Sequence, residues 1–255
     1  MAVSSSATQE PAQHRSHTRR NLLVVILAVI VVGGAVGGGY GLWYLFLRPG
    51  GPAAVGGAVV FPSGAPVAAP ASLDGTWNVN DSLGSMTDFS ASWVGYRVKE
   101  QLAGIGANTA IGRTPKVTGS MTLTGTVVSN VQVTGDLTAL QSDDPNRDDQ
   151  LHHQAIDTDH FPTAAFKTTT PIDLGSLPAE GATVSVVAKG TLTLHGVTRP
   201  LDITVQAARQ GGVIGVTGSM NIVFADFGFN GPTSFAVLTV EDHGIMELHV
   251  LFTHA

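Results

Sequence analysis

The stretch NRDDQLHHQAIDTDHFPTAAF, Asn146 to Phe166, decides the fold prediction. It gathers charged residues, histidines and aromatic residues inside a chain that is otherwise rich in Thr, Val, Gly and Ala. Segments in which apolar and polar residues alternate lie on both sides of it. We therefore predict that it forms the single long, partly helical crossover of an all-β domain.

Apolar residues recur at every second position on both sides of this crossover. Val94, Tyr96 and Val98 alternate with small or charged residues, as a strand with one buried face requires. The same period is found in Thr76 to Asn80, Met121 to Leu123, Val131 to Leu137, Ala165 to Leu174, Val184 to Leu194, Leu201 to Val205, Met220 to Phe224 and Met246 to Phe252. Such one-faced antiparallel strands must close into a barrel or stack as a sandwich to bury their apolar face and protect their edges.

Two dipeptides are typical of tight turns between these strands. His195-Gly196, between Leu194 and Val197, predicts a two-residue hairpin. Ser129-Asn130 predicts a similar turn. His195 is interpreted as a turn residue and not as a catalytic base, because His tolerates a positive φ better than most residues.

The N-terminal part differs in character from the rest of the chain. Residues 1–21 are polar and predict a disordered cytoplasmic tail. Residues 22–47 carry no formal charge and are long enough to cross a bilayer as one helix. Arg15, Arg19 and Arg20 precede this run, so the positive-inside rule places the C-terminal part outside the cytoplasm. The rival interpretation is a cleaved signal peptide, although no clear A-x-A site follows the apolar run.

Residues 48–72 hold five Pro and five Gly and predict a flexible linker. The domain is then expected to span 73–255. After residue 48 the chain has nine Lys and Arg against eighteen Asp and Glu, and an acidic domain of this kind disfavours nucleic acid as a partner.

Neither a cofactor nor a catalytic group is predicted. The chain lacks Cys, so thiolate nucleophiles and thiolate metal sites are excluded. The histidines and aspartates between His152 and His160 fit no zinc spacing, and the aspartates from Asp143 to Asp149 lack the Gly and the distal Glu of a calcium loop. The sequence contains no nucleophile elbow and no phosphate-binding Gly loop.

Four motifs together carry a family resemblance. RDDQL (Arg147 to Leu151), FPTAAF (Phe161 to Phe166), GTLTLHGVTRPLDI (Gly190 to Ile203) and ADFGF (Ala225 to Phe229) follow one another in the order seen in YceI-like proteins. VGYRVKE, Val94 to Glu100, matches the family's second-strand motif. Residues 74–252 therefore resemble that family. The chain departs from its pattern at Ala155-Ile156, where Asp-Phe is usual, and at Glu100, where His is usual.

The resemblance implies an extended, lipocalin-like antiparallel β-barrel of about eight strands, with a short helical crossover. It further implies a binding role without chemistry, in which the barrel holds a long apolar lipid of isoprenoid type. The residues expected to face this ligand are Val94, Tyr96, Val98, Met121, Leu123, Phe166, Leu192, Leu194, Ile222 and Phe224. Arg147 and Asp148 are expected at the polar end of the cavity or as a clamp on the crossover.

The sequence thus predicts a single-pass, membrane-anchored lipid carrier or store. The first alternative is an interaction or stress-response module whose barrel is filled by its own side chains. The second is an unrecognised hydrolase or metal-dependent enzyme. A homodimer stays open, since a single small-xxx-small match at Gly33 to Gly37 is a weak signal.

Overall fold

The computed structural model describes residue 39 and residues 51–64, 67–232 and 237–255. Contacts divide the chain into two units, Met1–Gly50 and Gly51–Ala255. Within the described ranges, no helix combines the length and the apolar content that a membrane crossing needs. The predicted tail and span lie outside these ranges, apart from Gly39.

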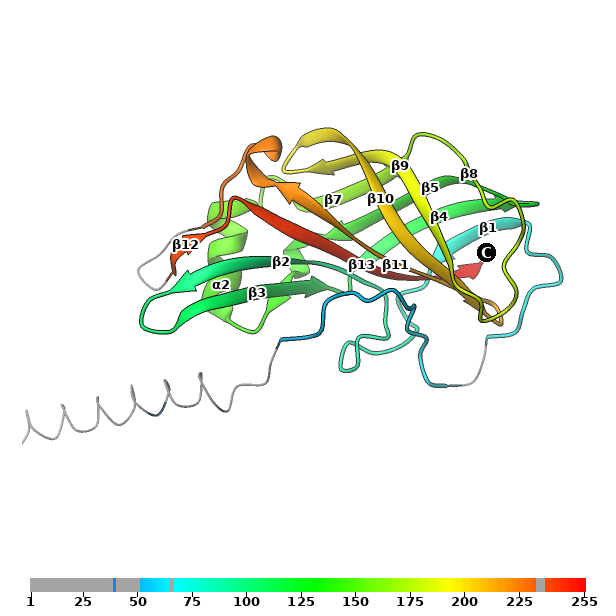
Figure 1. The fold of residues 1–255 in the computed structure, drawn as a ribbon, viewed down its shortest axis with the longest axis horizontal. Helices are drawn as coiled ribbons and strands as arrows, with labels where there is room; N and C mark the ends of the chain where they lie inside the picture. The colour runs from blue at the N-terminus through cyan, green and yellow to red at the C-terminus, as the bar shows by residue number, and fades with distance from the viewer. Residues whose placement is uncertain (1–38, 40–50, 65–66, 233–236) are drawn as a thin grey trace, which may run out of the picture. The chain divides into compact units, whose positions relative to one another are not determined.

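The unit Gly51–Ala255 is an antiparallel β-barrel with one short helix (Figure 1). Its strands are β1 (Gly75–Val79), β2 (Trp93–Leu102), β3 (Gly106–Thr114), β4 (Val117–Thr124), β5 (Val127–Asp136), β6 (Gln141–Ser142), β7 (Thr163–Thr168), β8 (Ile172–Asp173), β9 (Val184–Leu194), β10 (Val197–Gln210), β11 (Val213–Val223), β12 (Val237–Val240) and β13 (His243–His254). The helix α2 (Pro145–Gln150) runs into a π-helical turn, η3 (Leu151–Ala155), and the 3-10 turns are η2 (Leu137–Ala139) and η4 (Phe224–Phe227). The crossover predicted from Asn146 to Phe166 is therefore confirmed as partly helical.

Eight of these strands close into a ring. The order is β1-β4-β5-β7-β9-β10-β11-β13, and β13 pairs back to β1. Closure removes the free edges that an open sheet of one-faced strands would expose. The predicted all-β barrel is confirmed, and of the two arrangements that the strand pattern allowed, the sandwich is wrong.

Strand β13 pairs with two different strands along the same edge. Its C-terminal part pairs with β1, with Phe252 opposite Val79, and its N-terminal part pairs with β2, with Met246 opposite Tyr96. The β2–β3 hairpin thus extends the wall at the end of the barrel where α2 lies, whereas β8 and the C-terminus lie at the other end (Figure 1). We refer to these as the α2 end and the β8 end.

The two predicted turns have different outcomes. His195 and Gly196 both have positive φ, 51° and 71°, and connect β9 to β10 as predicted. The prediction for Ser129-Asn130 is wrong, because both residues lie inside β5 and the hairpin turn falls at Gly125-Thr126. Asn130 has a φ of 52° where the pairing register with β4 shifts. Its positive φ therefore forms part of a β-bulge and not of a hairpin turn.

Residues 51–64 belong to the stretch 48–72 for which the sequence predicts a flexible linker. We call them the strap, because they lie along the outside of the barrel and bond to β2, β3 and β13. The backbone N–H of Val55 donates to Glu247 Oε1 at 2.9 Å, and the Arg97 guanidinium donates to the carbonyl oxygens of Pro52 and Ala53. Since a Pro- and Gly-rich segment has no pattern of its own, its position comes from side chains that the barrel supplies.

His249 on β13 fastens the strap to the wall as well. Its ring nitrogens lie 2.9 Å from the Ala91 carbonyl oxygen and 2.8 Å from the Val60 carbonyl oxygen. Burial lowers the pKa of His249, and the Arg113 charge adds to this, against the two carbonyl contacts. A neutral imidazole donates only one hydrogen bond, so in that state only one of the two carbonyls accepts from His249.

Candidate binding site inside the barrel

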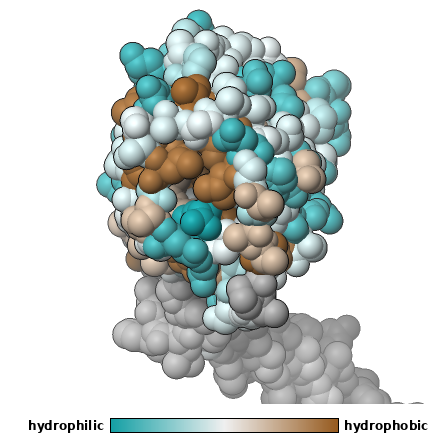
Figure 2. Space-filling model, turned by 90° about the vertical axis from the view of Figure 1, so that its right-hand side faces the viewer, coloured by the Kyte–Doolittle hydropathy of each residue, from teal (hydrophilic) through white to brown (hydrophobic). Residues whose placement is uncertain are grey.

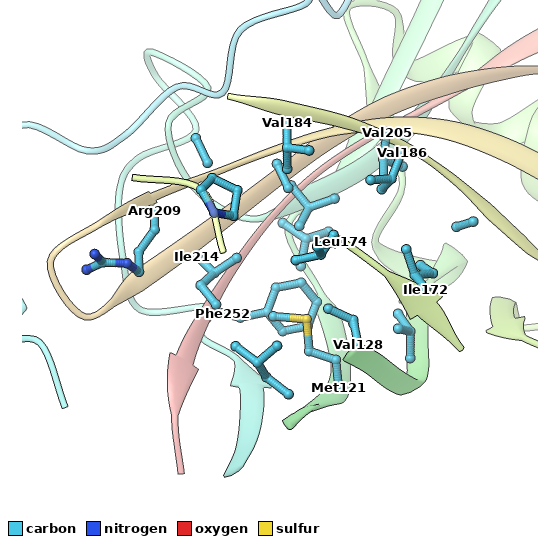
Figure 3. A pocket seen from close by; sticks show the side chains of 18 of the residues that line it. Met121, Val128, Ile172, Leu174, Val184, Val186, Val205, Arg209, Ile214 and Phe252 are labelled. Carbon is cyan, nitrogen blue, oxygen red and sulfur yellow. The ribbon is translucent and has the colours of Figure 1, made fainter. Parts of the chain in front are cut away.

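The barrel interior contains a cavity at each end. The β8-end cavity has a volume of about 140 Å³ and is enclosed by aliphatic and aromatic side chains from β4, β5, β7, β9, β10, β11 and β13. Figure 3 shows several of them, among them Met121, Val186 and Phe252, directed toward one another. Arg209 is the one charged residue of this lining within the described ranges, and its guanidinium points away from the apolar side chains (Figure 3).

The β8-end cavity reaches the surface beside the loop that joins β8 to β9. Leu174, Leu177 and Pro178 from this loop line it, and Leu177 is also exposed to solvent. The loop is tied to the β10–β11 turn, because the Gly211 N–H donates to Glu180 Oε1 at 2.9 Å. Figure 2 shows apolar side chains gathered at this end of the barrel, with hydrophilic residues around them.

The α2-end cavity has a volume of about 90 Å³ and is closed by the crossover. Leu151, Ala155 and Ile156 form its helical side, and their i, i+4 and i, i+5 spacing places them on one face of the turn. Opposite them lie apolar residues of β2, β9 and β11. Unlike the other cavity, this one also contacts Tyr96, Glu100 and Arg147, so it has a polar end.

An ion pair forms this polar end. Arg147 Nη2 donates to Glu100 Oε1 at 2.8 Å, and Nη1 donates to Asp143 Oδ1 at 2.6 Å. The Asn108 side-chain amide also donates to Glu100 Oε1, at 2.6 Å. Burial alone would lower the pKa of Arg147, but the hydrogen bond and charge of Glu100 outweigh it, so the net shift is upward. The pair ties α2 to β2, and Arg147 keeps its charge.

The start of α2 explains why Arg147 reaches this position. Asp144 caps the helix, with its carboxylate accepting from the Asn146 N–H at 2.9 Å, and Pro145 occupies the first turn. Asp148 Oδ1 accepts from the Ser142 N–H at 2.8 Å. Asp148 therefore fixes the chain entering the helix, and it does not line either cavity.

Two buried polar atoms at this end have no hydrogen-bond partner within the described residues. They are the hydroxyl oxygen of Tyr96 and Nε of Arg147. Burial raises the pKa of the Tyr96 phenol, so the hydroxyl keeps its proton at neutral pH. Both atoms are hydrogen-bond donors, and an unsatisfied buried donor costs about 1–3 kcal/mol, so an oxygen acceptor brought by a ligand would be stabilised here.

Most of the predicted ligand-facing residues line one of the two cavities. Val94, Tyr96, Val98, Leu194, Ile222, Phe224 and Arg147 line the α2-end cavity. Met121, Leu123 and Phe166 line the β8-end cavity. Leu192 is buried but lines neither. That these side chains contact a ligand stays a prediction.

Sequence reasoning did not assign Glu100 or the helical residues to the site. Glu100 shares the alternation of Tyr96 and Val98, which would have placed it inward. The sequence pattern did not identify Leu151 and Ala155 as inward residues. The residues around them are polar, and one short helical face gives too few apolar positions for a periodic signal. Among the described residues, no three His, Cys, Asp or Glu side chains lie close enough to hold a metal ion.

Residues 86–252 match the sequence model of the YceI-like domain. The chain belongs to this family. The match confirms the resemblance that rests on the motifs from Val94 to Phe229. The YceI-like match includes every strand from β2 to β12 and most of β13, but not the strap.

Two curated relatives and one solved structure are similar to this YceI-like chain. A UPF0312 protein of Vibrio cholerae is 33% identical over 129 residues, which is 48% of this chain and 61% of that protein. A UPF0312 protein of Vibrio parahaemolyticus is 30% identical over 129 residues, which again cover 48% of this chain and 61% of that protein. The chain thus spans 61% of the length of these relatives.

The solved structure is a polyisoprenoid-binding domain from Saccharophagus degradans that is implicated in plant cell wall breakdown. It aligns with a TM-score of 0.50 and 17% identity, over 64% of this chain and 98% of that domain. At this identity the likeness establishes the shared barrel fold.

Proposed function

We propose that this YceI-like chain is a binding protein that holds a long apolar lipid of isoprenoid type in its barrel, as a carrier or store and without chemistry. The observation that carries the proposal is the pair of apolar cavities at opposite ends of one barrel interior, with a polar group at one end only. Lipid surface removed from water contributes about 25 cal/mol per Å², so affinity needs no charged contact. The fold shared with a polyisoprenoid-binding domain supports the choice of ligand.

The polar end gives the lipid a direction. Tyr96 Oη and Arg147 Nε are unsatisfied donors at the α2 end, whereas the β8-end cavity offers aliphatic and aromatic side chains. A lipid with an oxygen at its head would lie with that oxygen beside Tyr96 and its chain toward β8. Arg147 and Glu100 then act together, since Arg147 is held in place by the carboxylate.

The alternative is a ligand-free interaction or stress-response module. Cavity size favours it, because about 140 Å³ and 90 Å³ fall below the roughly 300–1,000 Å³ of most ligand sites. The two functions differ in one measurable respect. A lipid-binding barrel must expand to admit its ligand and must be stabilised by it, whereas a filled barrel gains nothing from added lipid.

Added isoprenoid alcohol should raise the melting temperature of residues 51–255. At a concentration 100 times the dissociation constant the stabilisation is about 2.7 kcal/mol, which corresponds to roughly 5–10 °C for a domain of this size. Differential scanning calorimetry measures the shift, and a straight-chain alcohol of equal length is the control for isoprenoid preference. An unchanged melting temperature with every chain tested would favour the ligand-free alternative.

We also propose that residues 22–47 anchor the chain in the cell membrane with the barrel outside the cytoplasm. The uncharged run and the preceding Arg15, Arg19 and Arg20 support this proposal. Protease added to intact cells should then remove the barrel and spare residues 1–21. A mature chain whose intact mass places its N-terminus between Gly33 and Arg48 would contradict it and favour a cleaved signal peptide.

A further inference from the structure

We infer that a layer of side chains between the two cavities divides the barrel interior and sets which lengths of apolar chain it prefers. The inference rests on the proposed lipid-binding function and specifies the ligand further. We call this layer the septum and define it as Phe166 on β7, Leu192 on β9 and Met220 on β11.

The order of inward residues along two strands locates the septum. On β11, Val216 lines the β8-end cavity and Ile222 lines the α2-end cavity, but Met220 between them lines neither. On β9, Ala188 and Leu194 line opposite cavities, and Leu192 between them again lines neither. Both strands thus change from one cavity to the other across a packed layer.

Packing shows that these side chains fill the interior at this level. Leu192 belongs to the buried cluster at the α2 end, and Phe166 belongs to a separate buried cluster toward the β8 end. Met220 packs against both clusters. It is therefore the side chain that bridges the two cavities, and a lipid chain occupying both must pass through its position.

A glycine fixes Phe166 in the septum. A Cβ atom at Gly190 would lie 2.5 Å from Cζ of the Phe166 ring, so the ring occupies space that exists because residue 190 has no side chain. The Phe166 ring therefore lies against β9 at Gly190. Met220 has an unbranched thioether chain that adopts new rotamers at small cost, which makes it the movable part of the septum.

Because of the septum, binding costs more free energy for a long isoprenoid chain than for a short one. A short isoprenoid chain occupies one cavity alone and leaves Met220 in place. A long chain must turn Met220 aside before it reaches the unsatisfied donors at the α2 end. Shortening Met220 removes this cost for long chains alone, so the ratio of the two affinities should change.

The test compares Met220→Ala with Ile222→Ala in residues 51–255. Both changes remove a large inward side chain from β11, but Ile222 lines the α2-end cavity and its removal leaves the septum closed. The probes are an isoprenoid alcohol of three units and one of eight units, and the readout is the ratio of their dissociation constants. Met220→Ala should shift this ratio toward the long chain by about tenfold or more, whereas Ile222→Ala removes a contact of the long chain alone and should not shift the ratio in that direction.

The possible outcomes distinguish failure of the septum from failure of the proposed lipid binding. Leu192→Ala opens the same layer and replaces Met220→Ala if that variant does not fold, because Leu192 lines neither cavity. Equal ratios in the wild type and the septum variants would overturn the septum while the proposed lipid binding stands. A ratio shifted equally by Ile222→Ala would also overturn it, since cavity enlargement alone would then suffice. A wild-type chain that binds neither alcohol would overturn both proposals.

Discussion

Replacing Glu247 with Ala should lower the free energy of unfolding of the barrel by about 3–5 kcal/mol, the range found when one partner of a buried ion pair is removed. The Glu247 side chain is only 1% exposed. Its Oε1 accepts from Arg97 Nε at 2.7 Å and its Oε2 accepts from Arg113 Nη2 at 3.4 Å. Without the carboxylate, the buried Arg113 and the partly buried Arg97 both lose this anionic partner.

The surroundings of Arg113 make this loss hard to relieve. Its guanidinium lies 4.2 Å from the centroid of the Phe89 ring and 3.7 Å from that of Trp93. Burial lowers the pKa of Arg113, and the charge of Glu247 opposes that shift. The aromatic rings hold the cation in place, so it cannot turn out to water when Glu247 is removed. The strap loses its Val55 hydrogen bond at the same time.

Urea unfolding of the wild type and Glu247→Ala measures the change. Glu241→Ala is the matched control, because the Glu241 side chain is 40% exposed and its ion pair within the described residues is with the half-exposed His243. Its effect should stay within about 0.5 kcal/mol. A loss below about 1 kcal/mol for Glu247→Ala would mean that water or strap movement compensates the two cations, and the strap would then not be an integral part of the barrel.

Tyr96→Asp should abolish lipid binding and cost several kcal/mol of stability, because an unpaired carboxylate would be buried in the cavity wall. Tyr96 lines the α2-end cavity, and its hydroxyl oxygen has no partner among the described residues. The charge of Arg147 acts on position 96 against those of Asp148 and Glu100, so the expected cost comes from burial. Calorimetry and lipid titration together measure the two effects.

Tyr96→Phe is the matched variant that removes only the hydroxyl. Since that hydroxyl has no hydrogen-bond partner among the residues that the structure describes, its loss should leave the melting temperature unchanged or slightly raised. A lipid whose head oxygen accepts from Tyr96 should bind this variant more weakly, whereas a hydrocarbon without oxygen should bind as before. Equal weakening for both ligands would contradict the proposed direction of the lipid in the barrel.

The elements predicted correctly from the sequence are those that local residues determine. The alternation of Val94, Tyr96 and Val98 depends only on the period of a strand, and the His195-Gly196 turn depends on two backbone conformations. Ser129-Asn130 carried the same local signal but formed a bulge, because the partner strand β4 determines the register there. The residue types at Ser129-Asn130 predict a positive φ, but they do not determine whether it occurs in a hairpin turn or in a β-bulge.

The strap and the septum depend on contacts between distant parts of the chain. Val55 bonds to Glu247 across 192 positions, and Val60 lies against His249 across 189. Nothing in a Pro- and Gly-rich segment indicates that an outward Arg or His will bind its backbone. Likewise Leu192 has the alternation of a ligand-facing residue, and only the packing of Met220 between two clusters shows that this level of the interior is filled.

Organic extraction followed by mass spectrometry tests the central claim most directly. Residues 51–255 form the compact unit of the structure and are purified from cells without detergent, in parallel with Tyr96→Asp. The account predicts an isoprenoid lipid in the wild-type extract, in an amount that rises with the protein, and none in the extract of the variant. A wild-type extract without lipid, from a protein whose melting temperature added isoprenoids leave unchanged, would contradict it.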